Sequence, residues 1–198
     1  MSIKIATHAS DVDGLVSAAL FLLKYPDAEI RFLKLGDLKY VNEEFDYIVD
    51  LPKIDGAKIN IDHHISNYKH LVKEGKLTDK DLVDPKAPSA ATLVIKYLDL
   101  TNNKIARELV KMAEIADTGR YDPNLIKLDL IIKCANGHQD KLLLIAKKLS
   151  EKGKDILKDE FIKREWKRLE KAYKKGLKIA KDISVSYTHL TLPTTERV

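Results

Sequence analysis

Acidic and imidazole side chains of this 198-residue chain gather in four short segments. The segments read HASDVDG, VD, DHH and DTG, and their polar residues are His8, Asp11, Asp13, Asp50, Asp62, His63, His64 and Asp117. Carboxylates pressed together repel one another and raise their pKa values unless divalent cations neutralise the charge. Nitrogen and oxygen would supply every ligand, because a single cysteine, Cys134, cannot form a thiolate cage. This mixture suits two octahedral ions such as manganese better than magnesium or structural zinc.

Each segment alone also has an ordinary structural interpretation. An Asp-x-Asp-Gly turn such as Asp11–Gly14 is usually loop chemistry, in which an aspartate caps the following helix. The DTG segment at Asp117 is a weak signal by itself, whereas the adjacent His63 and His64 follow an apolar run, where imidazoles rarely serve packing. The occurrence of all four segments in this order favours a cation site.

Short β-branched runs and helical stretches alternate over residues 1–140. The runs predict five strands, at Ile3–Thr7, Ile30–Lys34, Tyr47–Leu51, Lys58–Ile61 and Leu82–Asp84. Apolar residues at three- and four-residue spacing predict helices at Leu15–Lys24, Ala90–Leu100 and Lys104–Ala116. Such alternation is typical of the α/β class, with a parallel five-stranded sheet flanked by helices. Since these sheets bind ligands outside the carboxyl ends of their strands, three of the four segments should meet at one edge.

A long basic helix is expected after the sheet. One helix should run through Ser150 and stop at Gly153, and a second should run from about Asp155 to Asp182. The second helix carries an apolar stripe that should be buried, made of Ile162, Trp166, Leu169, Tyr173, Leu177 and Ala180. Residues 141–181 hold 15 Lys and Arg against 6 Asp and Glu, which suits either a solvated helix face or the steering of a polyanion.

Composition limits the class of protein. With 44% apolar residues the chain can bury a real core, which excludes disorder for most of it. No stretch approaches the roughly 18 to 20 uninterrupted apolar residues that span a bilayer, and the start MSIKIATHAS lacks the layout of a signal peptide. We therefore expect a cytoplasmic protein with no membrane partner.

The segments HASDVDG, YIVDLP, DHH and ADTGRY resemble the four successive motifs of the DHH phosphoesterase superfamily, and the resemblance covers roughly residues 3–125. It implies a dinuclear manganese centre in which Asp50 bridges the two ions. Carried over by position, one ion would take His8, Asp11 and Asp50, and the other would take Asp13, Asp50, His63 and Asp117. Two residues separate His8 from Asp11, one more than in the family's exonuclease-like pattern.

The resemblance also implies hydrolysis of a phosphodiester bond. Two cations can share one water, lower its pKa and hold the resulting hydroxide in line with a phosphorus atom. The predicted catalytic residues are Asp50 and His64, of which His64 has no ligand role in the family and would act on the substrate. Ser89 would present backbone amides to a phosphate or simply cap a helix, and Arg120 could contact phosphate.

Three functions are compatible with these motifs. The leading hypothesis is a manganese-dependent phosphodiesterase that acts on short oligonucleotides or dinucleotides. The alternatives are a hydrolase similar to inorganic pyrophosphatase and a non-catalytic nucleotide- or RNA-binding module. In the family a C-terminal domain selects the substrate, so residues 141–184 are predicted to be a helical extension that links the catalytic domain, 1–140, to such a domain, which is missing here. Residues 185–198 include SYTHLTLPTT, which resembles a translated sequencing adapter, so they are predicted to be a non-native tail.

Overall fold

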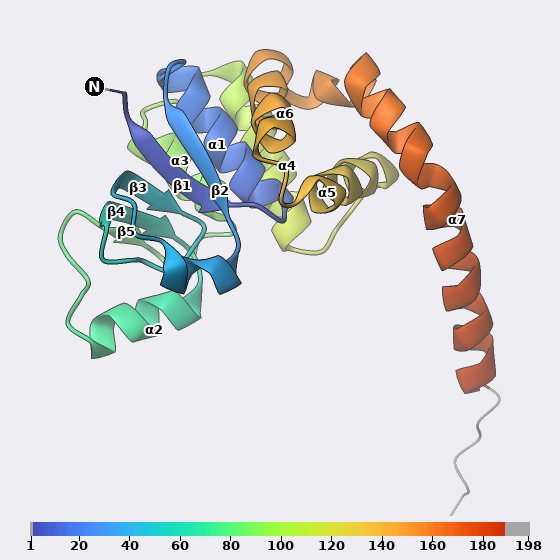
Figure 1. The fold of residues 1–198 in the computed structure, drawn as a ribbon, viewed down its shortest axis with the longest axis horizontal. Coiled ribbons are helices and arrows are strands. Elements are labelled where there is room, and N and C mark those ends of the chain that lie inside the picture. Colours follow the sequence, from blue (N-terminus) through green and yellow to red (C-terminus); the bar gives the residue numbers. More distant parts are fainter. Residues whose placement is uncertain (1, 189–198) are drawn as a thin grey trace, which may run out of the picture.

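A parallel β-sheet forms the centre of the protein. The computed structural model describes residues 2–188, and its five strands pair in the order β2-β1-β3-β4-β5, all parallel (Figure 1). The strands are β1 (Lys4–His8), β2 (Glu29–Leu33), β3 (Phe45–Val49), β4 (Ala57–Asp62) and β5 (Leu82–Val83). Each overlaps the run that predicts it, so the predicted α/β class with a five-stranded parallel sheet is confirmed.

Helices pack around one central helix, α1, on a face of this sheet. The helices of this layer are α1 (Val12–Lys24), α3 (Ala90–Tyr97), α4 (Lys104–Asp117) and α6 (Gln139–Lys152). Because α3, α4 and α6 all contact α1, its apolar side chains Leu15, Leu20 and Phe21 are fully buried. The same cluster includes Leu142 and Ile145 of α6, so the core is continuous across residue 140. The predicted division of the chain at that residue remains a prediction.

The other face of the sheet carries a smaller apolar cluster. Successive residues of a strand point to opposite faces, and Ile5 of β1 accordingly belongs to the main cluster while Ala6 belongs to the second. Leu38, from the short 3-10 helix η1 (Leu35–Tyr40), packs on this second cluster. Helix α2 (Ile65–Lys73), which the sequence pattern did not predict, follows β4 directly.

The strand order brings the carboxyl ends of β1, β3 and β4 side by side. In the register of the sheet Thr7 pairs with Val49, and Val49 pairs with Ile61. The residues that follow each of these positions therefore lie together at one edge. The order of strands also reverses between β1 and β3, and this switch point is where open α/β sheets bind ligands.

The C-terminal third is helical, as predicted, but with different boundaries. A further helix, α5 (Pro123–Ala135), was not predicted because its sequence is apolar on most sides and shows no clear stripe. The predicted stop at Gly153 is observed, with a positive φ of 54°. The next long helix, α7 (Glu160–Thr188), begins later than Asp155 because a 3-10 turn, η2 (Gly153–Lys158), comes first.

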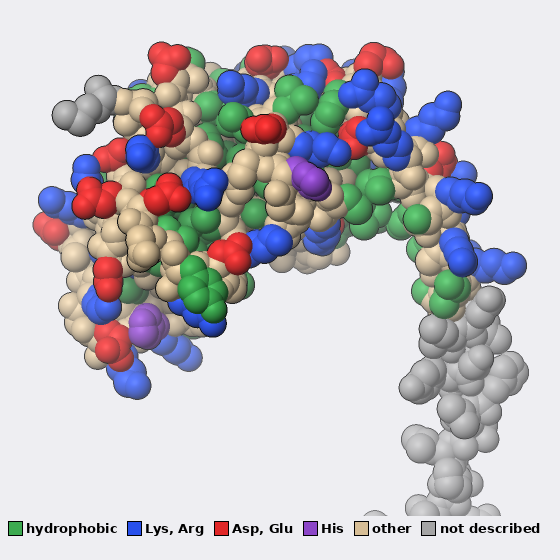
Figure 2. Space-filling model, viewed as in Figure 1, with side chains coloured by type: hydrophobic (Ala, Val, Ile, Leu, Met, Phe, Trp, Pro, Cys, Tyr) green, Lys and Arg blue, Asp and Glu red, His purple; other side chains and the backbone are tan. Residues whose placement is uncertain are grey.

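Helix α7 packs on the body with its first turns only and then extends away from it (Figure 1). Ile162 is buried and Trp166 packs partly against the core, whereas Leu177 is 45% exposed. The expected burial of the whole apolar stripe is therefore wrong for its second half. Lys and Arg side chains lie along the part of α7 nearer the body in Figure 2. The predicted non-native tail lies mostly outside the described residues.

Candidate metal centre

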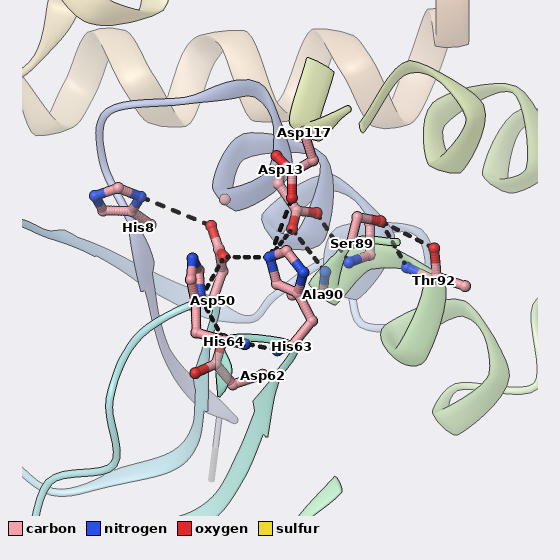
Figure 3. A network of polar contacts seen from close by, with 12 residues as sticks. His8, Asp13, Asp50, Asp62, His63, His64, Ser89, Ala90, Thr92 and Asp117 are labelled. Atoms are coloured by element: carbon pink, nitrogen blue, oxygen red, sulfur yellow. Dashed lines mark hydrogen bonds and ion pairs between the residues drawn. The ribbon is translucent and has the colours of Figure 1, made fainter. Parts of the chain in front are cut away.

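The polar residues of the four segments converge at the carboxyl edge of the sheet (Figure 3). Their ligand atoms form three groups in which every atom lies within 4.8 Å of the others: His8 with Asp11 and Asp50, Asp13 with His63 and Asp117, and Asp50 with Asp62, His63 and His64. We call His8 and Asp11 the loop set and Asp13, His63 and Asp117 the deep set, and we treat Asp50 separately. The structure thus brings together all six residues that the sequence nominates as metal ligands.

Asp50 lies between the two sets and presents one oxygen to each. Its Oδ2 is 3.7 Å from His8 Nδ1, and its Oδ1 is 3.7 Å from His63 Nε2. The residue directly follows β3 and has a φ of 55°, a left-handed conformation that costs a non-glycine residue about 1 kcal/mol or more. Its N–H donates to the Ile61 carbonyl at 3.0 Å, which holds this turn of the backbone against β4.

The loop set is built almost entirely within the connection from β1 to α1. Asp11 is the N-cap of α1, where its Oδ1 accepts the N–H of Gly14 at 2.9 Å and its Oδ2 meets His8 Nδ1. Gly14 is required here, because a Cβ at this position would lie 2.2 Å from the carbonyl oxygen of His8. The longer spacing between His8 and Asp11 therefore does not prevent the two side chains from meeting.

The deep set joins three distant parts of the chain. Asp13 is buried and accepts the backbone N–H groups of Ala90 at 2.7 Å and Ala91 at 2.9 Å, at the N-terminus of α3. His63 follows β4, and Asp117 is the last residue of α4. His63 Nε2 approaches Asp117 Oδ2 to 3.0 Å without the alignment of a hydrogen bond.

Orphaned polar atoms provide a test of whether a cation fits. Asp50 Oδ2 and His63 Nε2 are buried, and neither makes a hydrogen bond with the described residues. Buried polar atoms normally have partners, and the exceptions require a cause such as an ion. Both atoms belong to residues of the candidate site, so the donors present fit a divalent cation.

The electrostatics of the centre also favour cations. Burial, followed by the charge of Asp117, raises the pKa of Asp13 to about 7. Burial and the neighbouring carboxylates of Asp13 and Asp11 raise the pKa of Asp50 well above its ordinary value. Burial by itself would also raise the pKa of Asp11, but hydrogen bonding and charge from His8 outweigh it, and the pKa falls. The charges of the loop set are thus partly balanced, whereas Asp13 and Asp50 need a proton or a cation.

His64 occupies the outer side of the centre. Its Nδ1 is 2.8 Å from Asp62 Oδ1, and its side chain is 51% exposed. The hydrogen bond to Asp62 outweighs partial burial and raises the pKa of His64. Asp62 itself is fully buried, and its Oδ2 accepts Asn67 Nδ2 at 2.7 Å. Asn67 also donates to Asn60 at 2.8 Å, so a buried amide network that the motifs did not indicate holds Asp62 in place.

Two predicted substrate contacts are placed differently from the ligands. Ser89 is fully buried and caps α3 by accepting the N–H of Thr92 at 3.2 Å. The amides that follow it, expected to meet phosphate, are engaged by Asp13. Arg120 is exposed, and its side chain makes no ion pair or hydrogen bond within residues 2–188. Substrate binding by Ser89 and Arg120 remains a prediction.

The fold and the cluster define an α/β protein with a candidate site for two cations at the switch point of its sheet. No protein-family model matches the chain, and no curated protein matches it. Among solved structures, it is similar to a pGpG-specific phosphodiesterase, PggH from Vibrio cholerae, with a TM-score of 0.67 and 19% sequence identity over 86% of this chain. The match covers 60% of the PggH chain. At this identity the likeness shows a shared fold. In addition, no helix in the described residues is long and apolar enough to cross a membrane.

Proposed function

We propose that this protein is a phosphodiesterase of the DHH type that depends on two divalent cations. The observation that carries the proposal is the placement of Asp50, whose two oxygens face different donor sets at equal distances of 3.7 Å. The shared fold with a dinucleotide phosphodiesterase supports the same reaction class. Membership of the DHH superfamily rests on the four motifs.

The proposed ligands are those of the two sets, with Asp50 common to both. Manganese is favoured because imidazole nitrogen joins carboxylate oxygen in each set. When bound, the two ions supply the Lewis acidity that makes a water nucleophilic near neutral pH and offsets the charge of the phosphate. The protein contributes fixed donors, since Asp13 is held by α3 and Asp11 by α1.

His64 is proposed to act on the substrate. Asp62 fixes the ring through Nδ1, and no described residue hydrogen-bonds Nε2. The raised pKa of His64 favours the imidazolium form, which can donate to a non-bridging oxygen or to the leaving group. The ring lies 4.4 Å, centroid to centroid, from that of His63, so it would meet a phosphate held at the deep set.

The proposed substrate is a dinucleotide or a short oligonucleotide. PggH acts on pGpG according to its name, and this chain carries the same fold over 60% of that protein's length. We further propose that residues 141–184 lead to a domain that helps to select the substrate, and that α7 is its connection.

A hydrolysis assay tests the function. Purified protein with manganese would be incubated with a dinucleotide, a cyclic dinucleotide and pyrophosphate, with an Asp50→Asn preparation as the blank. Release of mononucleotides from the dinucleotide, absent from the blank, is expected. Hydrolysis of pyrophosphate alone would replace the proposal with a pyrophosphatase, and tight dinucleotide binding without turnover would replace it with a binding module.

A further inference from the structure

The segment between α4 and α6 borders both donor sets. It begins directly after Asp117 of the deep set, and the chain reverses there through Gly119, which has a φ of 70°. It ends at Asn136, whose Nδ2 donates to Ser10 Oγ at 2.7 Å, beside Asp11 of the loop set. Helix α5, which the sequence pattern missed, therefore lies in a segment that runs from beside one set to beside the other.

Lys133 lies on this helix, three residues before Asn136 and so on the same side of the helix. Its Nζ is paired with Asp129 Oδ2, yet the lysine side chain is 52% exposed while that of Asp129 is 8% exposed. Asp129 Oδ1 is buried and has no hydrogen-bond partner among the described residues. The buried carboxylate of Asp129 thus positions the lysine side chain and leaves its ammonium group exposed to solvent beside an otherwise acidic site.

Tyr121 lies on the same segment, four residues after Asp117. Its ring packs partly against the main core, and part of it is exposed. Burial is the main cause of a raised pKa of Tyr121, and the charges of Asp129, Asp11 and Asp117 add to it. Asp11 also contributes to the raised pKa of Lys133, where burial is outweighed by Asp129. Both side chains are therefore within electrostatic range of the candidate ligands.

We propose that Tyr121 and Lys133 form a nucleotide-binding rim, at which Lys133 contacts a phosphate and Tyr121 stacks on a base. This rests on the proposed function and names its substrate class as nucleotides, because stacking on Tyr121 requires a base, which pyrophosphate lacks. A cation at the rim offsets the charge of an anionic substrate that approaches four carboxylates. Aromatic stacking on a base is tolerant of sequence and is common in proteins that bind single-stranded nucleic acids.

Kinetics of matched variants test this rim. Lys133→Gln and Tyr121→Leu should each raise KM for a dinucleotide roughly tenfold while kcat changes less than about threefold and manganese content is unchanged. The conservative variants Lys133→Arg and Tyr121→Phe should keep KM close to the wild-type value. The controls are Lys127→Gln, on the same helix but over the Trp166 ring, and Tyr40→Leu, which is exposed on η1. With a dinucleotide that lacks its bases, Tyr121→Leu should have no effect.

A binding measurement separates failure of the rim from failure of the proposed function. The probe is a fluorescent phosphorothioate-linked dinucleotide, whose Kd is measured by anisotropy without turnover. If wild-type protein hydrolyses nothing, a roughly tenfold weaker Kd in both variants still supports the rim. If the dinucleotide is hydrolysed but KM and Kd of both variants match wild type, the rim is wrong and the hydrolase stands. Equal losses in the two control variants would also overturn it.

Discussion

The two donor sets are built in different ways although they share Asp50. The loop set is local, since His8 and Asp11 are three residues apart and Asp11 is satisfied by Gly14 and His8. The deep set depends on tertiary structure, because Asp13 must meet the N-terminus of α3 and His63 must meet the end of α4. Burial tends to raise the pKa of both Asp11 and Asp13, but only for Asp11 do the neighbouring groups outweigh it. Cation binding should therefore be coupled to folding mainly through the deep set.

Removal of the shared ligand should have the largest effect, because it damages both sets. Asp50→Asn is expected to lower kcat on the order of 10³-fold or more and to reduce the manganese content of the protein, measured by elemental analysis. His70→Ala, on the exposed side of α2, is the control and should change neither quantity. Two fully bound manganese ions in Asp50→Asn would contradict the bridging role.

Removal of His64 should leave both sets intact. His64→Ala is expected to lower kcat on the order of 10²-fold, the usual contribution of a group that transfers a proton or stabilises charge, while metal content stays unchanged. His64→Gln should keep part of the activity if the ring acts as a hydrogen-bond donor. Loss of metal in His64→Ala would instead make this residue a ligand. This is the competing interpretation, because His64 Nδ1 lies 3.8 Å from Asp50 Oδ1.

Paired substitutions measure the difference between the sets directly. Asp13→Asn removes a carboxyl group whose pKa stays raised although His63 lies 3.7 Å away, whereas Asp11→Asn leaves its contact with Gly14 possible. Manganese titration should show weaker binding in both variants. The Kd of the ion at the deep set should rise about 100-fold in Asp13→Asn, and the Kd of the ion at the loop set should rise about tenfold in Asp11→Asn. Equal losses would show that the two sets are energetically alike.

The sequence predicted that the candidate ligands converge, because each lies near the end of a regular element. Period-two runs locate the strands, and in a parallel sheet the residues after β1, β3 and β4 must share an edge. The assignment of ligands to two ions that the family resemblance implies stays a prediction, although Asp11 lies with His8 and Asp13 with His63 and Asp117. What the sequence did not show depends on tertiary contacts. The contact of Asp13 with Ala90 and Ala91 crosses more than 70 residues, so Ser89 was expected to serve phosphate instead.

The same dependence on tertiary contacts explains why the sequence did not predict the amide network that holds Asp62. Asn60 interrupts an apolar strand, a signal of a buried polar network, but its partner Asn67 lies on a short helix, α2, that is polar on average. Helix α5 was missed for the opposite reason, because apolar residues cover most of its surface. Burial of the α7 stripe was overestimated because helix length was taken to imply packing along all of it, whereas contact with the body ends after Trp166 and Leu169.

The smallest expected effect is a dependence of stability on pH that appears only without metal, and it separates the two sets thermodynamically. The folded-state pKa of Asp13 is about 7 against an ordinary 3.8, so between these values the folded protein binds more protons than the unfolded chain. Stability of the metal-free protein should therefore fall as pH rises from about 4 to 7, and the raised pKa values of Asp50 and His63 act in the same direction. The lowered pKa of Asp11 acts only below its ordinary value of 3.8, so the loop set contributes little to this window.

Circular dichroism in EDTA should accordingly give a lower Tm at pH 8 than at pH 5.5, at about 2–4 °C per kcal/mol for a chain of this size. Manganese should remove the difference, because cations stabilise the ionised carboxylates that protons otherwise neutralise. The matched controls are Asp13→Asn, which should flatten the dependence in EDTA, and Asp11→Asn, which should not. A Tm in EDTA that rises from pH 5.5 to pH 8, or an equal flattening in the two variants, would show that the uncompensated charge is not concentrated in the deep set.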